Sequence, residues 1–168
     1  MKKIMRIMTF IAILFAMNAC SADTAEGTET NSASNEILIT NYTYNDSELG
    51  TMKLINDYRV SIGLNTLEPI NHISAKCEEH NKYMIENNVV DHNDFVARSE
   101  NLEKVLGAKK VGENVAYNYK TSEAVVKAWL DSPGHKENIE GNFTHFGISV
   151  TVDAATGKKY YTNIFVKI

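Results

Sequence analysis

The sequence predicts an α+β fold in which helices pack on an antiparallel sheet. Segments with apolar residues at helical spacing lie between residues 45 and 132. Beyond residue 144 the apolar residues alternate with period two, over residues 145–153 and again over 158–168. Helical segments followed by alternating strands are typical of this class, and 168 residues are enough for one domain with its own core.

The first 19 residues have the organisation of an export signal. Lys2, Lys3 and Arg6 precede an apolar run, residues 7–17, that is short for a transmembrane helix. Small residues before Cys20 resemble the cleavage box of bacterial lipoproteins, with Met17 where leucine is more usual. We expect cleavage before Cys20 and lipidation of that cysteine. The alternative is ordinary signal cleavage nearby, with Cys20 as a bystander.

Residues 20–44 are expected to form the lipidated cysteine and a flexible tether. Residues 21–36 contain no large apolar side chain, so they cannot bury enough surface to offset the entropy lost on ordering. Residues 37–44 are predicted to form a short strand or an extended lead-in. The folded domain is therefore expected over residues 45–168.

Four helices and a short helical turn are expected within this domain. The first starts at the cap residues Asn45–Ser47 and stops at Gly63. The second covers residues 71–88, with Asn71 as its cap, and a shorter third lies within 98–107. The fourth covers residues 121–132, with Ser122 as its cap. Proline cannot continue a helix, so Pro133 ends it and a helical turn over 135–141 follows.

The strands are predicted from alternation and from turn residues. Residues 145–153 and 158–168 are expected to pair as a hairpin through the loop at 154–157. A further strand is expected within residues 112–119, just before the fourth helix.

Charge and cysteine content exclude some classes of function. Removing residues 1–19 removes three basic residues and leaves 14 basic against 21 acidic residues, a net charge of −7. That balance argues against nucleic acid as a partner. Cys77, the only cysteine besides Cys20, falls in the apolar stripe of the second helix and is expected to be buried and inert.

Three polar side chains are candidates for a functional site. His92 lies just past the second helix among acidic residues, which favour one tautomer and the charged form. Glu113 follows a glycine within an apolar strand, where a buried carboxylate needs a partner. His135 follows the Pro133-Gly134 corner. The alternatives are a solvated loop histidine, an exposed turn acid and a helix cap.

The same residues carry a family resemblance. Residues 128–150 resemble the W-SPGHR-NI-F---G signature of the bacterial CAP superfamily, also called SCP-like extracellular proteins. Residues 54–67 resemble the family's N--R---GL--L opening, and Gly112–Ala116 matches its GEN-A motif. The resemblance runs from about residue 54 to residue 165. It implies an α-β-α sandwich with a shallow cleft.

The resemblance also implies a site. His92 matches the family's first cleft histidine, Glu113 the GEN glutamate, and Arg98 the arginine that follows the histidine. Asn142 stands where eukaryotic members carry a second histidine, so His135 is the candidate to replace it. The second acid is left open between Asp94 and Glu100. His92 and His135 are then possible ligands of a divalent metal such as zinc, which so few ligands would hold weakly.

Two functions are carried forward from the sequence. In the first, an envelope-anchored module binds a lipid, peptide or glycan in the cleft. In the second, a hydrolase uses Glu113 as base while His92 or His135 orients water or a metal. The sequence shows no nucleophile elbow and no HExxH motif. A third alternative is a structural or protein-interaction domain with a vestigial cleft, which fold resemblance alone does not separate from the other two. Binding is preferred over catalysis because a fold by itself is a weak warrant for an activity.

Overall fold

The computed structural model describes residues 37–168. The expected signal peptide, Cys20 and the tether up to residue 36 lie outside the described residues. Within residues 37–168, no helix combines the length and the apolar character needed to cross a membrane.

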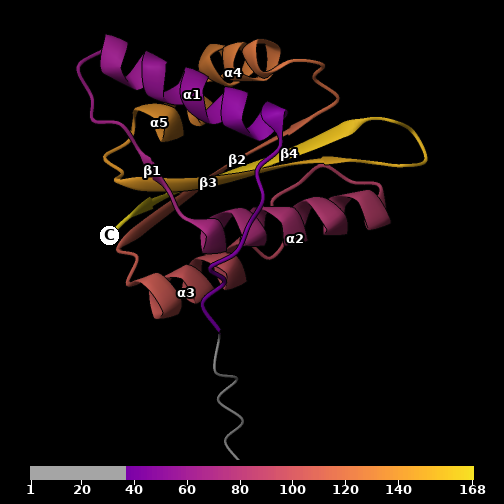
Figure 1. Cartoon of the computed structure of the whole chain (residues 1–168), viewed down its shortest axis with the longest axis horizontal. Helices are drawn as coiled ribbons and strands as arrows, with labels where there is room; N and C mark the ends of the chain where they lie inside the picture. Colours follow the sequence, from indigo (N-terminus) through magenta and orange to yellow (C-terminus); the bar gives the residue numbers. More distant parts are fainter. Residues whose placement is uncertain (1–36) are drawn as a thin grey trace, which may run out of the picture. The chain divides into compact units, whose positions relative to one another are not determined.

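A four-stranded sheet lies between two layers of helices (Figure 1). The elements in chain order are α1 (Asp46–Ser61), β1 (Glu68–Pro69), α2 (Asn71–Asn87), α3 (Phe95–Leu106), β2 (Lys110–Tyr117), α4 (Ser122–Asp131), α5 (Pro133–Glu140), β3 (His145–Val152) and β4 (Lys159–Lys167). Helices α1, α4 and α5 cover one face of the sheet, and α2 and α3 cover the other. This is the α-β-α sandwich that the family resemblance implied.

The order of the strands places β2, which carries Glu113, at one edge of the sheet. The order in the sheet is β1-β3-β4-β2, with β1 parallel to β3 and the other pairs antiparallel. The hairpin predicted from the alternation is therefore confirmed as β3–β4. Strand β2 has β4 as its only strand neighbour in the described sheet, so β2 presents a free edge.

Helix starts follow the predicted capping chemistry in one case and depart from it in two. Asn45 accepts from the Glu48 N–H at 3.0 Å, and the Glu48 carboxylate accepts from the Asn45 N–H at 2.9 Å, which is a complete capping box. Asn71 is not a cap, because it is the first helical residue of α2. Ser122 is not a cap either: Thr121 accepts from the Ala124 N–H, and the Ser122 hydroxyl instead donates to the Ser47 carbonyl.

The third and fifth helices extend beyond their predicted bounds. Helix α3 begins at Phe95 rather than at residue 98, and α5 begins directly at Pro133. Proline fits the first helical turn, because its missing N–H would lack a partner there anyway. Pro133 thus ends α4 and starts α5 in a single step.

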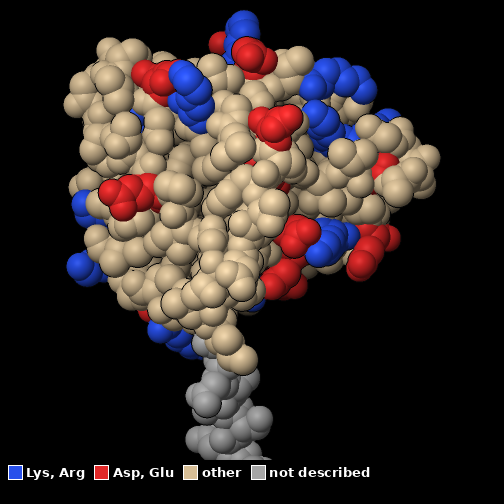
Figure 2. Space-filling view, in the orientation of Figure 1, with Lys and Arg blue, Asp and Glu red and all other residues tan. Residues whose placement is uncertain are grey.

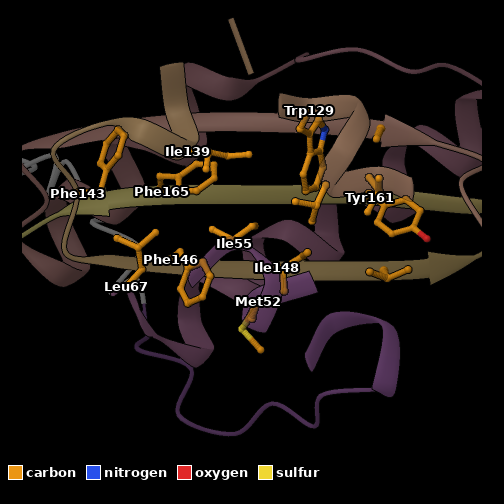
Figure 3. Close-up of a cluster of buried hydrophobic side chains, with 14 residues drawn as sticks. Met52, Ile55, Leu67, Trp129, Ile139, Phe143, Phe146, Ile148, Tyr161 and Phe165 are labelled. Carbon is orange, nitrogen blue, oxygen red and sulfur yellow. The ribbon is translucent and has the colours of Figure 1, made fainter. Parts of the chain in front are cut away.

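Three hydrophobic clusters within residues 37–168 give this unit its own core. Figure 3 shows the largest one, where Trp129, Tyr161 and Phe165 pack between the sheet and the α1, α4 and α5 layer. A second cluster, which includes Ile73 and Cys77, lies between the sheet and α2. Burial raises the pKa of the Cys77 thiol well above its usual value.

Arg59 is a fully buried cation that ties α1 to the end of α5. Its Nη1 donates to the carbonyl oxygens of Ile139 and Gly141 at 2.6 and 3.0 Å, and its Nε donates to the Asn65 carbonyl. Carbonyls at a helix C-terminus carry partial negative charge and lack partners within the helix. Arg59 therefore fixes the position of α5, the helix that carries His135.

The last part of the expected tether contacts the domain. Residues 37–44 have no regular secondary structure, yet the Ile39 N–H donates to His72 Nδ1 at 3.1 Å and the Tyr44 hydroxyl donates to Asn71. These bonds attach residues 39–44 to α2. The extended lead-in proposed for this stretch agrees with that path, and the strand alternative does not.

Acidic and basic side chains are scattered among uncharged ones over the face of the described residues seen in Figure 2. Several form helix-surface pairs, such as Lys53 with Asp57 and Lys127 with Asp131. Such exposed pairs contribute little to stability.

Candidate functional site

Glu113 lies in β2 with its side chain buried on the α2 and α3 face of the sheet. Its side chain is 1% exposed. At the preceding Gly112 a Cβ would lie 2.6 Å from Oδ1 of Asn138, so the glycine allows α5 to pack closely on β2.

Two side chains from the α2–α3 region meet the Glu113 carboxylate. Arg98 in α3 donates from Nε to Oε2 and from Nη2 to Oε1, both at 2.9 Å. This is a two-pronged, charge-assisted pairing. His92 lies 2.8 Å from Oε1 through its Nδ1.

This arrangement sets the charge of Glu113. Burial raises the pKa of the carboxyl, but the hydrogen bonds from His92 and Arg98 outweigh burial and hold its pKa below the usual value. Glu113 is therefore an anion at neutral pH, and its charge is balanced by Arg98.

The anion in turn fixes the tautomer of His92. A carboxylate can only accept, so Nδ1 of His92 carries the proton that it donates to Glu113. In the neutral ring, Nε2 is then an unprotonated acceptor. The His92 side chain is 48% exposed, so the ring is held on one side and open to solvent on the other.

His135 approaches the same edge of the sheet from the other helical layer. Asn114 in β2 donates to the His135 carbonyl at 3.0 Å. Asn138 in α5 donates both to the Glu113 carbonyl and to the Asn114 side chain, at 3.1 and 2.8 Å. Burial lowers the pKa of His135, and the charge on His92 lowers it further, so the two rings influence each other.

The structure joins His92 and Glu113 directly. His135 is linked to the adjacent Asn114 through its backbone carbonyl, and its side chain lines a different hollow from that of His92. Asn138 therefore joins α5 to β2.

Two hollows flank the histidines. One, of about 540 Å³, is lined by His92 and by both candidates for the second acid, Asp94 and Glu100. The other, of about 270 Å³, is lined by His135 with Ser132, Trp129 and part of β2. The described residues therefore offer concave surface next to each imidazole.

The donor set does not fit a metal held by three or four protein ligands. Among residues 37–168, no three His, Cys, Asp or Glu side chains are grouped so that they could hold a metal ion. Both oxygens of Glu113 are engaged by Arg98, whose positive charge also opposes a cation. Zinc binding by His92 and His135 stays a prediction, and no step below passes through a metal.

Two residues of this region were not recognised from sequence. Arg98 was matched to the family pattern, but its pairing with Glu113 was not foreseen. The available signal was its spacing of four from the buried Leu102, which places a cation on the inner face of α3. The second residue is His80, whose ring bonds to the Asp91 carbonyl next to His92.

The α-β-α sandwich is the fold expected of a CAP domain. The sequence profile of CAP, the cysteine-rich secretory protein family, matches residues 52–166, and the chain belongs to this family. Curated relatives from Bacillus subtilis (strain 168) are the uncharacterized membrane protein YlbC, 34% identical over 72% of this chain, and the uncharacterized protein YkwD, 36% identical over 60% of it. The chain spans only 34% and 41% of their respective lengths.

Solved structures share the same architecture. An outer surface protein from Borrelia burgdorferi is similar with a TM-score of 0.65 and 22% identity, covering 73% of this chain and 96% of that one. An extracellular SCP-domain protein from Bacillus anthracis is similar with a TM-score of 0.60 and 25% identity, covering 76% of this chain and 45% of that one.

Proposed function

We propose that this protein is exported, held at the cell envelope through a lipidated Cys20, and binds an envelope component at the His92–Glu113–His135 site. The relatives described as outer surface and extracellular proteins support export. The basic and apolar start of the chain and the small residues before Cys20 support the anchor.

The observation that carries the binding function is the buried Arg98–Glu113 pair. A buried ion pair adds little net stability, because desolvation offsets most of the attraction between the charges. Here the pair does something else: it keeps Glu113 anionic, and Glu113 holds a half-exposed imidazole in one tautomer and orientation. A fixed polar group beside a hollow is what ligand recognition requires.

The chemistry of the site favours a ligand that carries hydrogen-bond donors. With Nδ1 of His92 bonded to Glu113, Nε2 is an acceptor whenever the ring is neutral. Burial lowers the pKa of His135, which favours the neutral form of that ring. Hydroxyl and amide N–H groups match such acceptors. Among the envelope components considered, glycans and peptides provide these groups, whereas an acyl chain does not.

Calorimetric titration of the 37–168 domain with soluble peptidoglycan fragments tests this function. Stem-free glycan and free stem peptide separate the two ligand classes. Loss of one buried hydrogen bond corresponds to roughly a tenfold change in affinity, so His92→Ala and His135→Ala are each expected to weaken binding about tenfold. His145→Ala, a half-buried histidine on β3, is the matched control. Equal affinity in all variants, or no binding of any fragment, would refute the proposal.

A second function is favoured by the Glu113–His92 contact itself. Glu113, the base expected from the sequence, is buried and paired with Arg98, so the base in this second function would be His92. An imidazole whose Nδ1–H is held by a carboxylate can take a proton from water through Nε2. Cys77 is excluded as a nucleophile because it is buried and its thiol pKa is raised. Mass spectrometry of the same fragments after incubation would reveal hydrolysis. Turnover that His92→Ala reduces at least ~100-fold would establish the hydrolase.

The anchor is tested separately by palmitate labelling in the exporting cell. Label is expected in the full-length protein and not in Cys20→Ala. Equal labelling of both proteins would refute lipidation at this cysteine.

A further inference from the structure

His92 lies in a short loop between α2 and α3 whose backbone is tightly specified. The loop runs from Asn88 to Asp94, and both end residues adopt the left-handed conformation, with φ of 52° and 56°. Within it, the Asp91 carboxylate accepts from the Asn93 N–H at 3.0 Å, which closes a turn around His92.

Buried side chains hold the carbonyl groups on both sides of His92. His80, from α2, lies 2.9 Å from the Asp91 carbonyl through Nε2. Arg98, from α3, donates through Nη1 to the Asn93 carbonyl at 2.7 Å. His80 is 2% exposed, and Arg98 is 9% exposed, so both bonds are shielded from water.

The His80 ring is committed to this single bond. A carbonyl can only accept, so Nε2 of His80 carries the proton. Nδ1 is buried and has no hydrogen-bond partner among the described residues. The ring stacks on Tyr83 at 5.8 Å between centroids. An apolar side chain would avoid the cost of the unpaired Nδ1, so the value of an imidazole here lies in its Nε2–H.

We propose that His80 is a positioning residue for His92. By bonding to the Asp91 carbonyl, His80 holds the loop backbone in the position from which the His92 ring reaches Glu113. Arg98 holds the backbone on the other side of His92, at Asn93, and also binds the Glu113 carboxylate. The inference deepens the proposed function, because it concerns the same imidazole. The test of this positioning role needs no ligand, so the role of His80 and the proposed binding function can fail independently of each other.

The test is the nitrogen NMR signature of the His92 ring in the 37–168 domain at pH 7.5. The unmodified domain is expected to show a protonated, slowly exchanging Nδ1 and an unprotonated Nε2. In His80→Leu this Nδ1–H signal should be lost as His92 moves to the mixture of tautomers of an unrestrained ring. His80→Gln, whose amide can donate from nearly the same place as Nε2, should restore the signal.

The matched control is His72→Leu in the same helix. His72 is also a buried histidine, and it bonds to Ile39 and Asn101 rather than to the loop. It should change stability and leave the His92 signature intact. An unchanged His92 signature in His80→Leu, or equal loss in both leucine variants, would overturn the proposal. If His80→Leu does not fold, His80→Asn takes its place, because the asparagine amide is too short to reach Asp91. Identical His92 nitrogen signals in His80→Asn and His80→Gln would then overturn the proposal.

Discussion

Replacing Arg98 by methionine should destabilise the domain strongly, because it leaves the Glu113 anion buried without its cation. Methionine keeps the length and apolar stem of arginine but cannot donate to Glu113 or to the Asn93 carbonyl. Breaking a buried pair from one side costs about 3 to 5 kcal/mol. For a domain of this size that corresponds to a drop in melting temperature of about 10 to 20 °C.

The sign of the pH dependence follows from Glu113. In the unmodified domain its pKa is lowered, so its contribution to stability is present above the unfolded value of 4.5 and is lost as the pH falls through the folded value. Without Arg98, burial prevails and raises the folded pKa instead. As the pH falls through this raised pKa, Glu113 becomes protonated in the folded variant and no longer leaves an unpaired buried charge. The difference in free energy of unfolding between Arg98→Met and the unmodified domain should therefore shrink from pH 7 to pH 4.

Urea unfolding of the 37–168 domain at both pH values measures this. The double variant Arg98→Met/Glu113→Leu removes both charges and should regain most of the lost stability, because apolar replacement of a buried pair is close to neutral. The reasoning would be refuted if the free energy of unfolding of Arg98→Met at pH 7 lay within about 1 kcal/mol of that of the unmodified domain. It would also be refuted if the effects of the two substitutions were additive in the double variant.

Four further outcomes are expected. Cys77, the only cysteine of the 37–168 domain, should react with a thiol reagent only after unfolding; rapid reaction of the folded domain would show that it is not buried. Gly147→Ala should lower the free energy of unfolding by about 3 kcal/mol, because its Cβ would overlap the α2 backbone at Ser74. Gly134→Ala, in open space on α5, should raise it by roughly 0.5 kcal/mol in the same urea assay. Similar effects of the two variants would contradict the packing described. Burial lowers the pKa of His80, so the contribution of this residue to stability is full above pH 6.5 and declines below that pH. The free energy of unfolding should therefore depend less on pH in His80→Gln, and an unaltered pH dependence would contradict this. Two imidazoles alone would hold zinc weakly, so zinc should raise the melting temperature only slightly; a large rise that His92→Ala abolishes would contradict the conclusion that the site lacks three or four metal ligands.

The fold could be predicted from the sequence because its signals are local. The capping box at Asn45, the Pro133 break and the alternation in residues 145–168 each specify an element from a few neighbouring residues. Strand β1, only two residues long, has no such signal and forms because the chain pairs there with β3. The start of α3 was missed for a related reason: the left-handed Asp94 that precedes it is set by the loop.

The site was predicted in part. His92, Glu113 and His135 were chosen from residue type, local context and family resemblance. The structure joins His92 to Glu113 directly, whereas His135 contacts β2 through its backbone carbonyl. The partners that set their chemistry were harder to foresee, because they depend on contacts between distant segments. Arg98 reaches Glu113 only when α3 packs on β2, and Asn138 reaches Glu113 only when α5 packs on the same strand.

Ligand recognition is proposed at the β2 edge of the sheet, where His92 contacts Glu113 and Asn114 bonds to the His135 carbonyl. The most direct measurement is mapping of NMR chemical-shift changes on the isotopically labelled 37–168 domain during titration with peptidoglycan fragments. The account predicts that the largest changes cluster at these four residues. Changes that centre instead on the apolar groove of about 460 Å³ between α1 and α4, lined by Leu54, Tyr58 and Leu130, would contradict it.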